Sequence, residues 1–306
     1  MKMFWAVVLL AVFSCSAGEN RSPSAAAPAN AEAFKGYWYQ GKAELTRYDL
    51  EQARYGEIHH GSAVLIFVTE DFLPDKQVKY EYGERPEHVE SVLKLNFVRK
   101  FWTGIYPYSM MTSTFTPVDL QPGVALKLTC SSQEWCGHTY TQLNLRGKEY
   151  RGMLHSYFQE EGDREIRIPA ALPEDQLWAL IRIDPSRLPR GKTEFIPGLQ
   201  YLRLRHHPAR PEKALARLTT ELREDLSPDS LMAYQVEYSE IQRTLTIYFE
   251  KAFPHRILGW EETMLSGFRQ PKLLTTRAVR THWLMTDYWN KHSVADSTYR
   301  KQLGFE

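Results

Sequence analysis

Short segments in which apolar and polar residues alternate recur along most of this chain, and they limit its possible folds more than any other feature. Leu93, Leu95 and Phe97 alternate with more polar neighbours, as a half-buried β-strand requires. Residues 63–68 (AVLIFV) are apolar throughout, which is typical of a strand buried on both faces. Similar segments cover residues 150–159, 164–168, 200–206, 213–222, 231–239, 243–251, 255–264 and 272–283.

Two helices are expected to interrupt the strands. The segment 173–175 (Pro-Glu-Asp) has a proline at a favoured first position and acids that suit the positive end of the helix dipole. Asp-Pro at 184–185 ends this mid-chain helix. Ser293 and Asp296 form a capping box before a C-terminal helix over residues 297–303. We therefore predict a mainly β protein: an antiparallel meander that forms a curled sheet, a half-barrel or a sandwich around a helix.

The first fifteen residues, MKMFWAVVLLAVFSC, have the composition of an export signal. Lys2 is basic, and the apolar run 4–13 has about half of the roughly 20 residues that a spanning helix needs. The run ends in Val-Phe-Ser before Cys15, which resembles a bacterial lipobox. We therefore predict a lipoprotein signal peptide over residues 1–14 and acyl chains on Cys15. The alternative is an ordinary signal peptide cleaved after Ala17.

Residues 15–33 are small, polar and proline-containing, and this composition predicts a flexible tether. Residues 34–306 then form a β-rich domain, with a possible subdivision near residues 170–192. No acidic residue adjoins Ser16, and the familiar sorting rule then favours the outer membrane. We therefore expect a lipid-anchored protein of the cell envelope, on the outer membrane, with a periplasmic or surface face.

The charges give no sign of a polyanionic partner. The chain has 38 Lys and Arg residues against 37 Asp and Glu residues, intermixed along its length. Nucleic-acid binding needs a basic patch, so no nucleic acid is expected. The expected partners are a membrane, through the lipid on Cys15, and a lipid, a glycan or an envelope protein.

The oxidation state expected for the cysteines depends on the compartment of the protein. Besides Cys15, the chain contains only Cys130 and Cys136. In an oxidising envelope, two neighbouring cysteines form a disulfide more often than a metal or catalytic site. A tight turn near residues 132–133 would place them in facing positions of a hairpin, so we predict a disulfide. Two free thiols are the alternative.

A candidate ligand pocket is suggested by an uncharged stretch. Residues 102–116 carry no charge but are rich in Tyr, Ser, Thr and Met, and residues 133–140 follow on an adjacent hairpin. A concave, mostly apolar pocket with a few polar contacts has this composition. The residues predicted to line it are Trp102, Tyr106, Tyr108, Trp135 and Tyr140. A well-packed sheet face without a pocket is the alternative.

The same hairpin offers candidate catalytic residues. Positions i and i+2 of a strand share a face, so Glu134, Cys136 and His138 could lie together, with His155 on the next strand. An envelope hydrolase or transferase could use these four residues. No third group that would orient the histidine is evident. Adjacent histidines at 59–60 and 206–207 point to opposite strand faces and read as solvated loop residues, so no metal or cofactor is expected.

Three stretches resemble a family of Bacteroidota lipoproteins that often carry the label "septum formation inhibitor Maf". They read KGYWYQGKAELTRYDLEQARYGEIHHGSAVLIFVTEDFLPDKQVK, LKLNFVRKFWTGIYPYSMMTSTFTPVD and SSQEWCGHTYTQLNLR. The resemblance implies an envelope location and a β fold, and it implies no chemistry. The Ser-x-Ser-x-Arg motif of the Maf nucleotide pyrophosphatases is absent near the start of the chain, so that activity is not expected. The favoured function is a non-enzymatic binding module for a lipid, glycan or protein; a structural scaffold is a further alternative.

Overall fold

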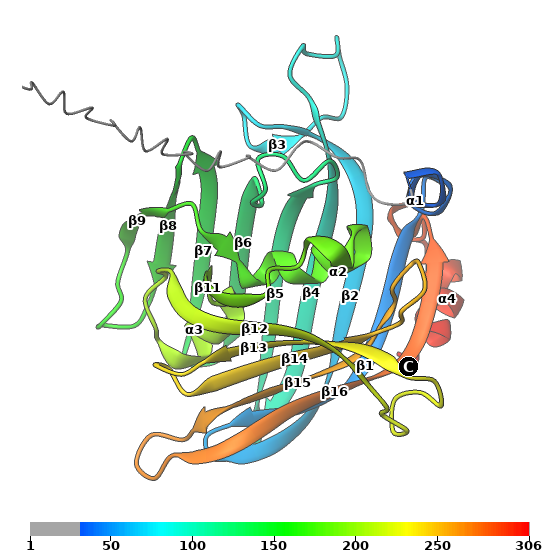
Figure 1. Ribbon diagram of the computed structural model, residues 1–306. Helices are drawn as coiled ribbons and strands as arrows, with labels where there is room; N and C mark the ends of the chain where they lie inside the picture. Colours follow the sequence, from blue (N-terminus) through cyan, green and yellow to red (C-terminus); the bar gives the residue numbers. More distant parts are fainter. Residues whose placement is uncertain (1–30, 306) are drawn as a thin grey trace, which may run out of the picture.

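The computed structural model describes residues 31–305 and consists of one 16-stranded sheet that curls without closing (Figure 1). The strands are β1 (Ala43–Arg54), β2 (Glu57–Leu73), β3 (Val78–Lys79), β4 (Glu90–Thr103), β5 (Tyr106–Pro117), β6 (Lys127–Glu134), β7 (Gly137–Arg146), β8 (Glu149–Ser156), β9 (Arg164–Pro169), β10 (Leu172–Pro173), β11 (Gly191–Ile196), β12 (Glu212–Glu221), β13 (Leu231–Tyr238), β14 (Arg243–Phe249), β15 (Ile257–Ser266) and β16 (Lys272–Thr286). The predicted mainly β, curled meander is confirmed.

Four α-helices and four short 3₁₀ segments accompany the sheet in the described residues. The helices are α1 (Ala31–Trp38), α2 (Leu177–Ile183), α3 (Leu199–Arg205) and α4 (Ser297–Gln302). The 3₁₀ segments are η1 (Glu174–Gln176), η2 (Pro185–Arg187), η3 (Tyr288–Asn290) and η4 (Val294–Asp296). None of the described helices is long and apolar enough to span a membrane. The predicted signal peptide, Cys15 and most of the predicted tether lie outside the described residues.

The sheet joins two meanders edge to edge. Strands β1, β2 and β4–β9 follow one another along one part of the sheet, and the short β3 pairs only with β2. Strands β11–β16 follow one another along the other part, and β16 pairs antiparallel with β1. The sheet is mixed only because the short β10 pairs parallel with β11. The chain near residues 170–192, where a subdivision was considered, connects the two meanders, and both belong to the same sheet.

The mid-chain helix forms where it was predicted, as η1 followed by α2, and ends at Asp184. It lies in the concavity of the sheet, where it packs against β4 (Figure 1). Trp178 of α2 contacts Phe97 and Trp260 of the sheet, with ring centroids 5.1 Å away in both cases. Burial of these large aromatic rings stabilises the curl, because the helix fills the space that an unclosed sheet leaves.

Helix α3 was not predicted. Residues 200–206 were expected to form a strand, but residues 199–205 are helical and also lie inside the concavity. All residues from Leu199 to Leu204 are buried. The helix makes only about two turns, and apolar and basic residues alternate from Leu202 to Arg205, so the local pattern resembles that of a strand.

Strand β1 is largely buried on both faces. Ala43 and Leu45 alternate with the polar Glu44 and Thr46 along it, and all four side chains are buried. Glu44 points into the concavity, where Arg182 of α2 forms a bidentate ion pair with it. Leu45 lies on the outer face, where it packs in a cluster with Leu303, the residue that follows α4.

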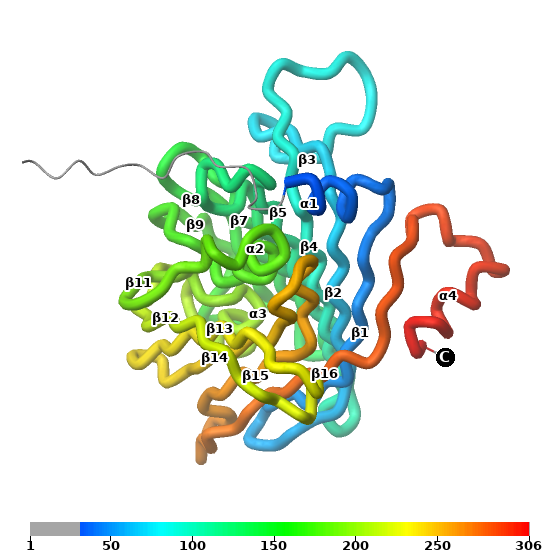
Figure 2. Tube along the Cα trace, turned by 45° about the vertical axis from the view of Figure 1, so that its right-hand side comes forward, coloured from blue at the N-terminus to red at the C-terminus, as the bar shows by residue number. Residues whose placement is uncertain are grey.

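The C-terminal helix α4 and its capping box are confirmed. The Ser293 backbone N–H donates to Asp296 Oδ2 at 3.0 Å and its hydroxyl donates at 2.6 Å. Figure 2 shows that α4 lies beside β1 and β16, away from α2. The concavity is therefore filled by α2 and α3, and they decide which inward-facing side chains can meet.

Candidate functional site

Helix α3 is fixed at both ends by buried charged side chains. At its start, Asp175 Oδ2 accepts a hydrogen bond of 2.8 Å from the Leu199 backbone N–H. Near its end, Arg54 Nη1 donates to the Leu204 carbonyl at 2.5 Å. Arg54 also donates to the Tyr108 hydroxyl at 3.2 Å. The helix is thereby fastened to β1, β5 and the mid-chain segment, and it forms a fixed wall.

A pocket of about 430 Å³ lies between α3, the inner face of β7–β9 and the loop that precedes β9. One part of the lining is apolar and consists of Leu154, Ile166, Ile168, Leu199, Leu202 and Ala209. The polar part includes Arg164, Arg203, His206 and His207 together with Glu160 and Glu161. The volume lies within the usual range for pockets that bind small molecules.

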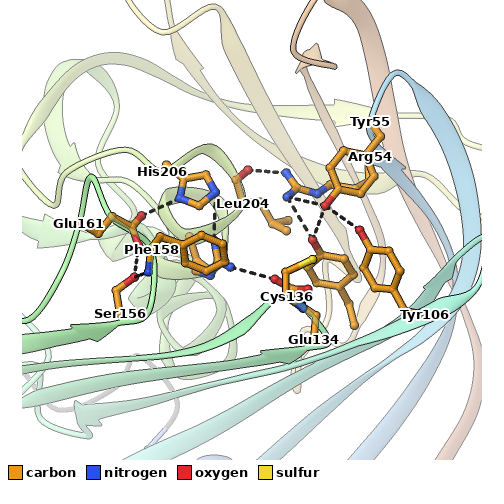
Figure 3. Close-up of polar contacts among 12 residues, drawn as sticks. Arg54, Tyr55, Tyr106, Glu134, Cys136, Ser156, Phe158, Glu161, Leu204 and His206 are labelled. Carbon is orange, nitrogen blue, oxygen red and sulfur yellow. Dashed lines mark hydrogen bonds and ion pairs between the residues drawn. The ribbon is translucent and has the colours of Figure 1, made fainter.

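A chain of polar contacts connects α3 with the hairpin turns beside the pocket (Figure 3). His206 Nδ1 lies 2.8 Å from Glu161 Oε1, which joins the end of α3 to the β8–β9 loop. Arg203 Nη1 lies 3.3 Å from His206 Nε2. Arg203 Nη2 lies 3.5 Å from Glu134 Oε1, and both of these side chains are buried. A guanidinium only donates, so His206 Nε2 accepts and Nδ1 carries the proton that is donated to Glu161.

Arg203 has spare hydrogen-bonding capacity at this pocket. Its guanidinium stacks over the Phe158 ring, 4.4 Å from the centroid. Its Nε is buried and has no hydrogen-bond partner among the residues described by the structure. Buried donors are almost always paired in folded proteins, so this N–H is a donor for which the described residues supply no acceptor, as are the Nε groups of Arg47, Arg54, Arg99 and Arg256.

The structure divides the predicted ligand pocket between two faces of the sheet. Tyr106, Tyr108 and Trp135 lie together, and the Tyr106 ring centroid is 5.9 Å from Tyr108 and 6.2 Å from Trp135. Trp102 and Tyr140 are 60% and 39% exposed and point to the outer face, because neighbours along a strand alternate between faces. The Tyr106 and Trp135 rings are stacked and the Tyr106 and Tyr108 rings are tilted, so these three side chains contact one another at one end of the sheet.

The predicted disulfide between Cys130 and Cys136 is wrong: both cysteines are free. The turn comes at residues 135–136, after β6 has continued to Glu134, so Cys130 faces Thr141. The extended strand from Cys130 to Glu134 spans about 13 Å, which is beyond the reach of a disulfide between Cys130 and the turn. Burial raises the pKa of Cys130 to about 12.

The four candidate catalytic residues do not come together in a single site. Glu134 is buried on the concave face, whereas His138 and His155 line a shallow depression on the outer face. Cys136 is exposed in the turn, and its backbone N–H donates to Glu134 Oε2 at 2.7 Å. The hydrogen bond with Glu134, partial burial and the carboxylate charge raise the pKa of the Cys136 thiol. A raised pKa disfavours the thiolate, so this geometry gives no support to a cysteine nucleophile.

The residues of the observed pocket were largely missed by sequence reasoning. The sequence pattern indicates solvated loop positions for His206 and His207, and no motif distinguishes Arg203 or Glu161. Their proximity depends on α3 lying inside the sheet, which no local pattern indicates. No group of three or more His, Cys, Asp or Glu side chains suited to a metal ion occurs within residues 31–305.

Comparisons with protein-family models, with curated proteins and with solved structures gave no match to this chain.

Proposed function

We propose that this protein is a membrane-anchored envelope lipoprotein that binds an amphiphilic molecule, without catalysis, in the pocket beside α3. One observation carries the proposal: an apolar wall on β8, β9 and α3 adjoins a guanidinium whose Nε lacks a partner in the described part of the chain. An apolar ligand body gains free energy by leaving water at the wall. An acceptor on its head, such as a carboxylate or phosphate oxygen, would pair with Arg203.

The occupant that suits this lining best is an acyl chain with an acidic head group. Leu154, Ile166 and Leu202 offer an apolar surface for an acyl chain, and the polar part of the lining offers partners for an acidic head group. The hydrogen bond between His206 and Glu161 holds the β8–β9 loop beside the helix, so the pocket is largely preformed.

Replacing Leu154 by tryptophan tests the ligand class. The larger ring should occupy the pocket and weaken binding of a fluorescent fatty acid by about tenfold or more, because the acyl chain loses its place at the wall. The assay uses the exported Cys15→Ser chain, which carries no acyl groups of its own, and fluorescence titration with the fatty acid. The matched control is Met153→Trp, on the opposite face of the same strand, which should bind like the parent.

Three outcomes contradict the proposal. They are failure of the parent chain to bind fatty acid, equal binding by the Leu154→Trp variant, and binding of a fatty alcohol as tight as that of the acid. The last result would remove the role given to Arg203.

The lipid anchor has its own test. We expect radioactive palmitate to label the protein in its native host, and the label to be lost completely in the Cys15→Ser variant, because the acyl acceptor is then absent. Immunoprecipitation followed by autoradiography measures this. Cys136→Ser, which removes the exposed thiol in the β6–β7 turn, is the control and should keep the label. A mature N-terminus beyond residue 15 would show that an ordinary signal peptide is cleaved instead.

A further inference from the structure

Exposed apolar side chains gather at one end of the curled sheet, which we call the turn rim. The rim comprises the exposed Tyr55, Ile105, Trp135, Tyr157 and Phe268 together with the half-buried Tyr106. We propose that the turn rim inserts into the interfacial layer of a lipid bilayer. Membrane insertion goes beyond ligand binding in the pocket. It depends on the proposed lipid anchor in one respect only, namely which membrane the rim contacts.

The topology places all of these turns at the same end. In an antiparallel meander every second turn falls on one side, and β1–β2, β4–β5, β6–β7 and β8–β9 are such turns. The β15–β16 turn joins them because β16 pairs with β1. The Gly56 backbone N–H donates to the Ser266 hydroxyl at 3.1 Å, which fixes the β1–β2 and β15–β16 turns side by side.

Side-chain contacts link the rim residues into one surface. The rings of Phe268 and Tyr55 have centroids 5.7 Å apart. The Tyr106 hydroxyl donates to the Tyr55 hydroxyl at 3.0 Å, and the Tyr106 and Trp135 rings are stacked at 6.2 Å. Tyr157 lies against Gly137, which belongs to the same hairpin as Trp135. A Cβ added at Gly137 would lie 3.1 Å from the Tyr157 ring. Apolar and aromatic side chains from five turns therefore lie together at one end of the sheet.

The exposure of these side chains is large. Ile105 is 75% exposed, Trp135 68%, Tyr157 81% and Phe268 70%. Clusters of exposed apolar side chains on this scale mark interaction sites.

The chemistry of the rim fits a bilayer interface. Tyr and Trp combine an apolar body with a polar group, and they are enriched where membranes meet water. The side chains project from convex turns, which suits insertion into a soft layer better than enclosure of a small molecule. The β4–β5 turn carries no charged residue from 102 to 107, so insertion desolvates no charge there.

The anchor and the rim can reach one membrane together. Residues 16–30 separate Cys15 from α1, and a segment of this length can span at most about 50 Å. Strand β1, which leads from the α1 end to the rim, has 12 residues and spans about 40 Å. An anchored molecule can therefore turn its rim towards the bilayer. Tyr157 and the pocket residue Glu161 share the β8–β9 loop, so the pocket opens beside the proposed contact.

Vesicle binding of the Cys15→Ser chain tests the proposal without the anchor. The probe is a vesicle of phosphatidylethanolamine and phosphatidylglycerol at about 3:1, and co-flotation measures the bound fraction. The parent should float with the vesicles. Binding should be weaker by about tenfold or more in the triple variant, which carries Ile105→Ser, Trp135→Ser and Phe268→Ser. The control replaces Tyr82, Leu222 and Val294 by serine; these are 87%, 60% and 94% exposed and lie outside the rim turns. This variant should bind like the parent.

Three results would overturn the proposal. They are failure of the parent to float, equal losses in the rim and control variants, and binding of the rim to peptidoglycan fragments instead of vesicles. Fatty-acid titration of the rim variant separates this inference from the proposed function, because the pocket lining is unchanged in it. Retained fatty-acid binding with lost flotation is the expected combination.

Discussion

Replacing Arg243 by methionine is expected to lower the free energy of unfolding by about 3–5 kcal/mol, the largest effect anticipated for a single substitution here. Arg243 is buried between two carboxylates. Its Nη2 lies 2.7 Å from Glu174 Oε1, and its Nε lies 2.7 Å from Glu262 Oε1. Arg99 reaches Glu262 from the other side at 3.3 Å. Methionine would leave the Glu174 carboxylate without its ion-pair partner inside the protein.

The direction in which the pKa of Glu262 is shifted agrees with a buried ion pair to Arg243. Burial by itself raises the pKa of Glu262, but Arg243 and Arg99 outweigh that effect and leave it lowered. Removing a buried charge costs far more than removing an exposed one. The matched control is Arg217→Met, because Arg217 pairs with Glu237 where both side chains are more than 40% exposed. Urea unfolding of both variants measures the difference, and equal losses would contradict the argument.

Replacing Asp175 by asparagine is expected to change how stability depends on pH. Burial, together with the nearby Glu174 carboxylate, raises the pKa of Asp175 from 3.8 to about 7, against the opposing effects of the Leu199 N–H, Arg243 and Arg99. An acid with a raised pKa binds its proton more tightly in the folded state. Its contribution to stability is therefore complete below pH 4 and is lost as the pH rises towards 7.

The asparagine variant should remove this loss. The side-chain oxygen can still accept the hydrogen bond from the Leu199 N–H, but it has no charge to bury. Relative to wild type, the variant should gain up to about 4 kcal/mol between pH 4 and pH 8. Urea unfolding at pH 4, 6 and 8 gives the difference at each pH. The control is the exposed Asp229→Asn, and a difference for Asp175→Asn that stays constant with pH would contradict the assigned cause.

The strands were predictable because their signal is local. Alternation over a few residues, as at Leu93, Leu95 and Phe97, reports one buried face regardless of what covers it. The capping box at Ser293 and Asp296 was likewise visible, since its hydrogen bonds lie within four residues. The curled meander follows from many such segments in succession.

The hairpin containing Cys130 and Cys136 shows where local reasoning fails. The polar run 131–134 resembles a turn, but Ser132 and Glu134 are buried on the concave face, and Glu134 pairs with Arg203 of α3. The strand therefore continues to Glu134, which moves the turn and separates the cysteines. Glu44 of β1 is a second case, since its inward orientation depends on Arg182.

The sequence by itself determined a mainly β chain, a curled meander and the positions of the mid-chain and C-terminal helices, because periodicity and capping act between near neighbours. Only the tertiary structure decided that α3 is a helix inside the sheet, that inward carboxylates are matched by arginines, and that the pocket and turn rim exist. These features join residues far apart in the chain, as Glu134 is from Arg203, and their stability comes from burial and charge pairing that no local segment contains.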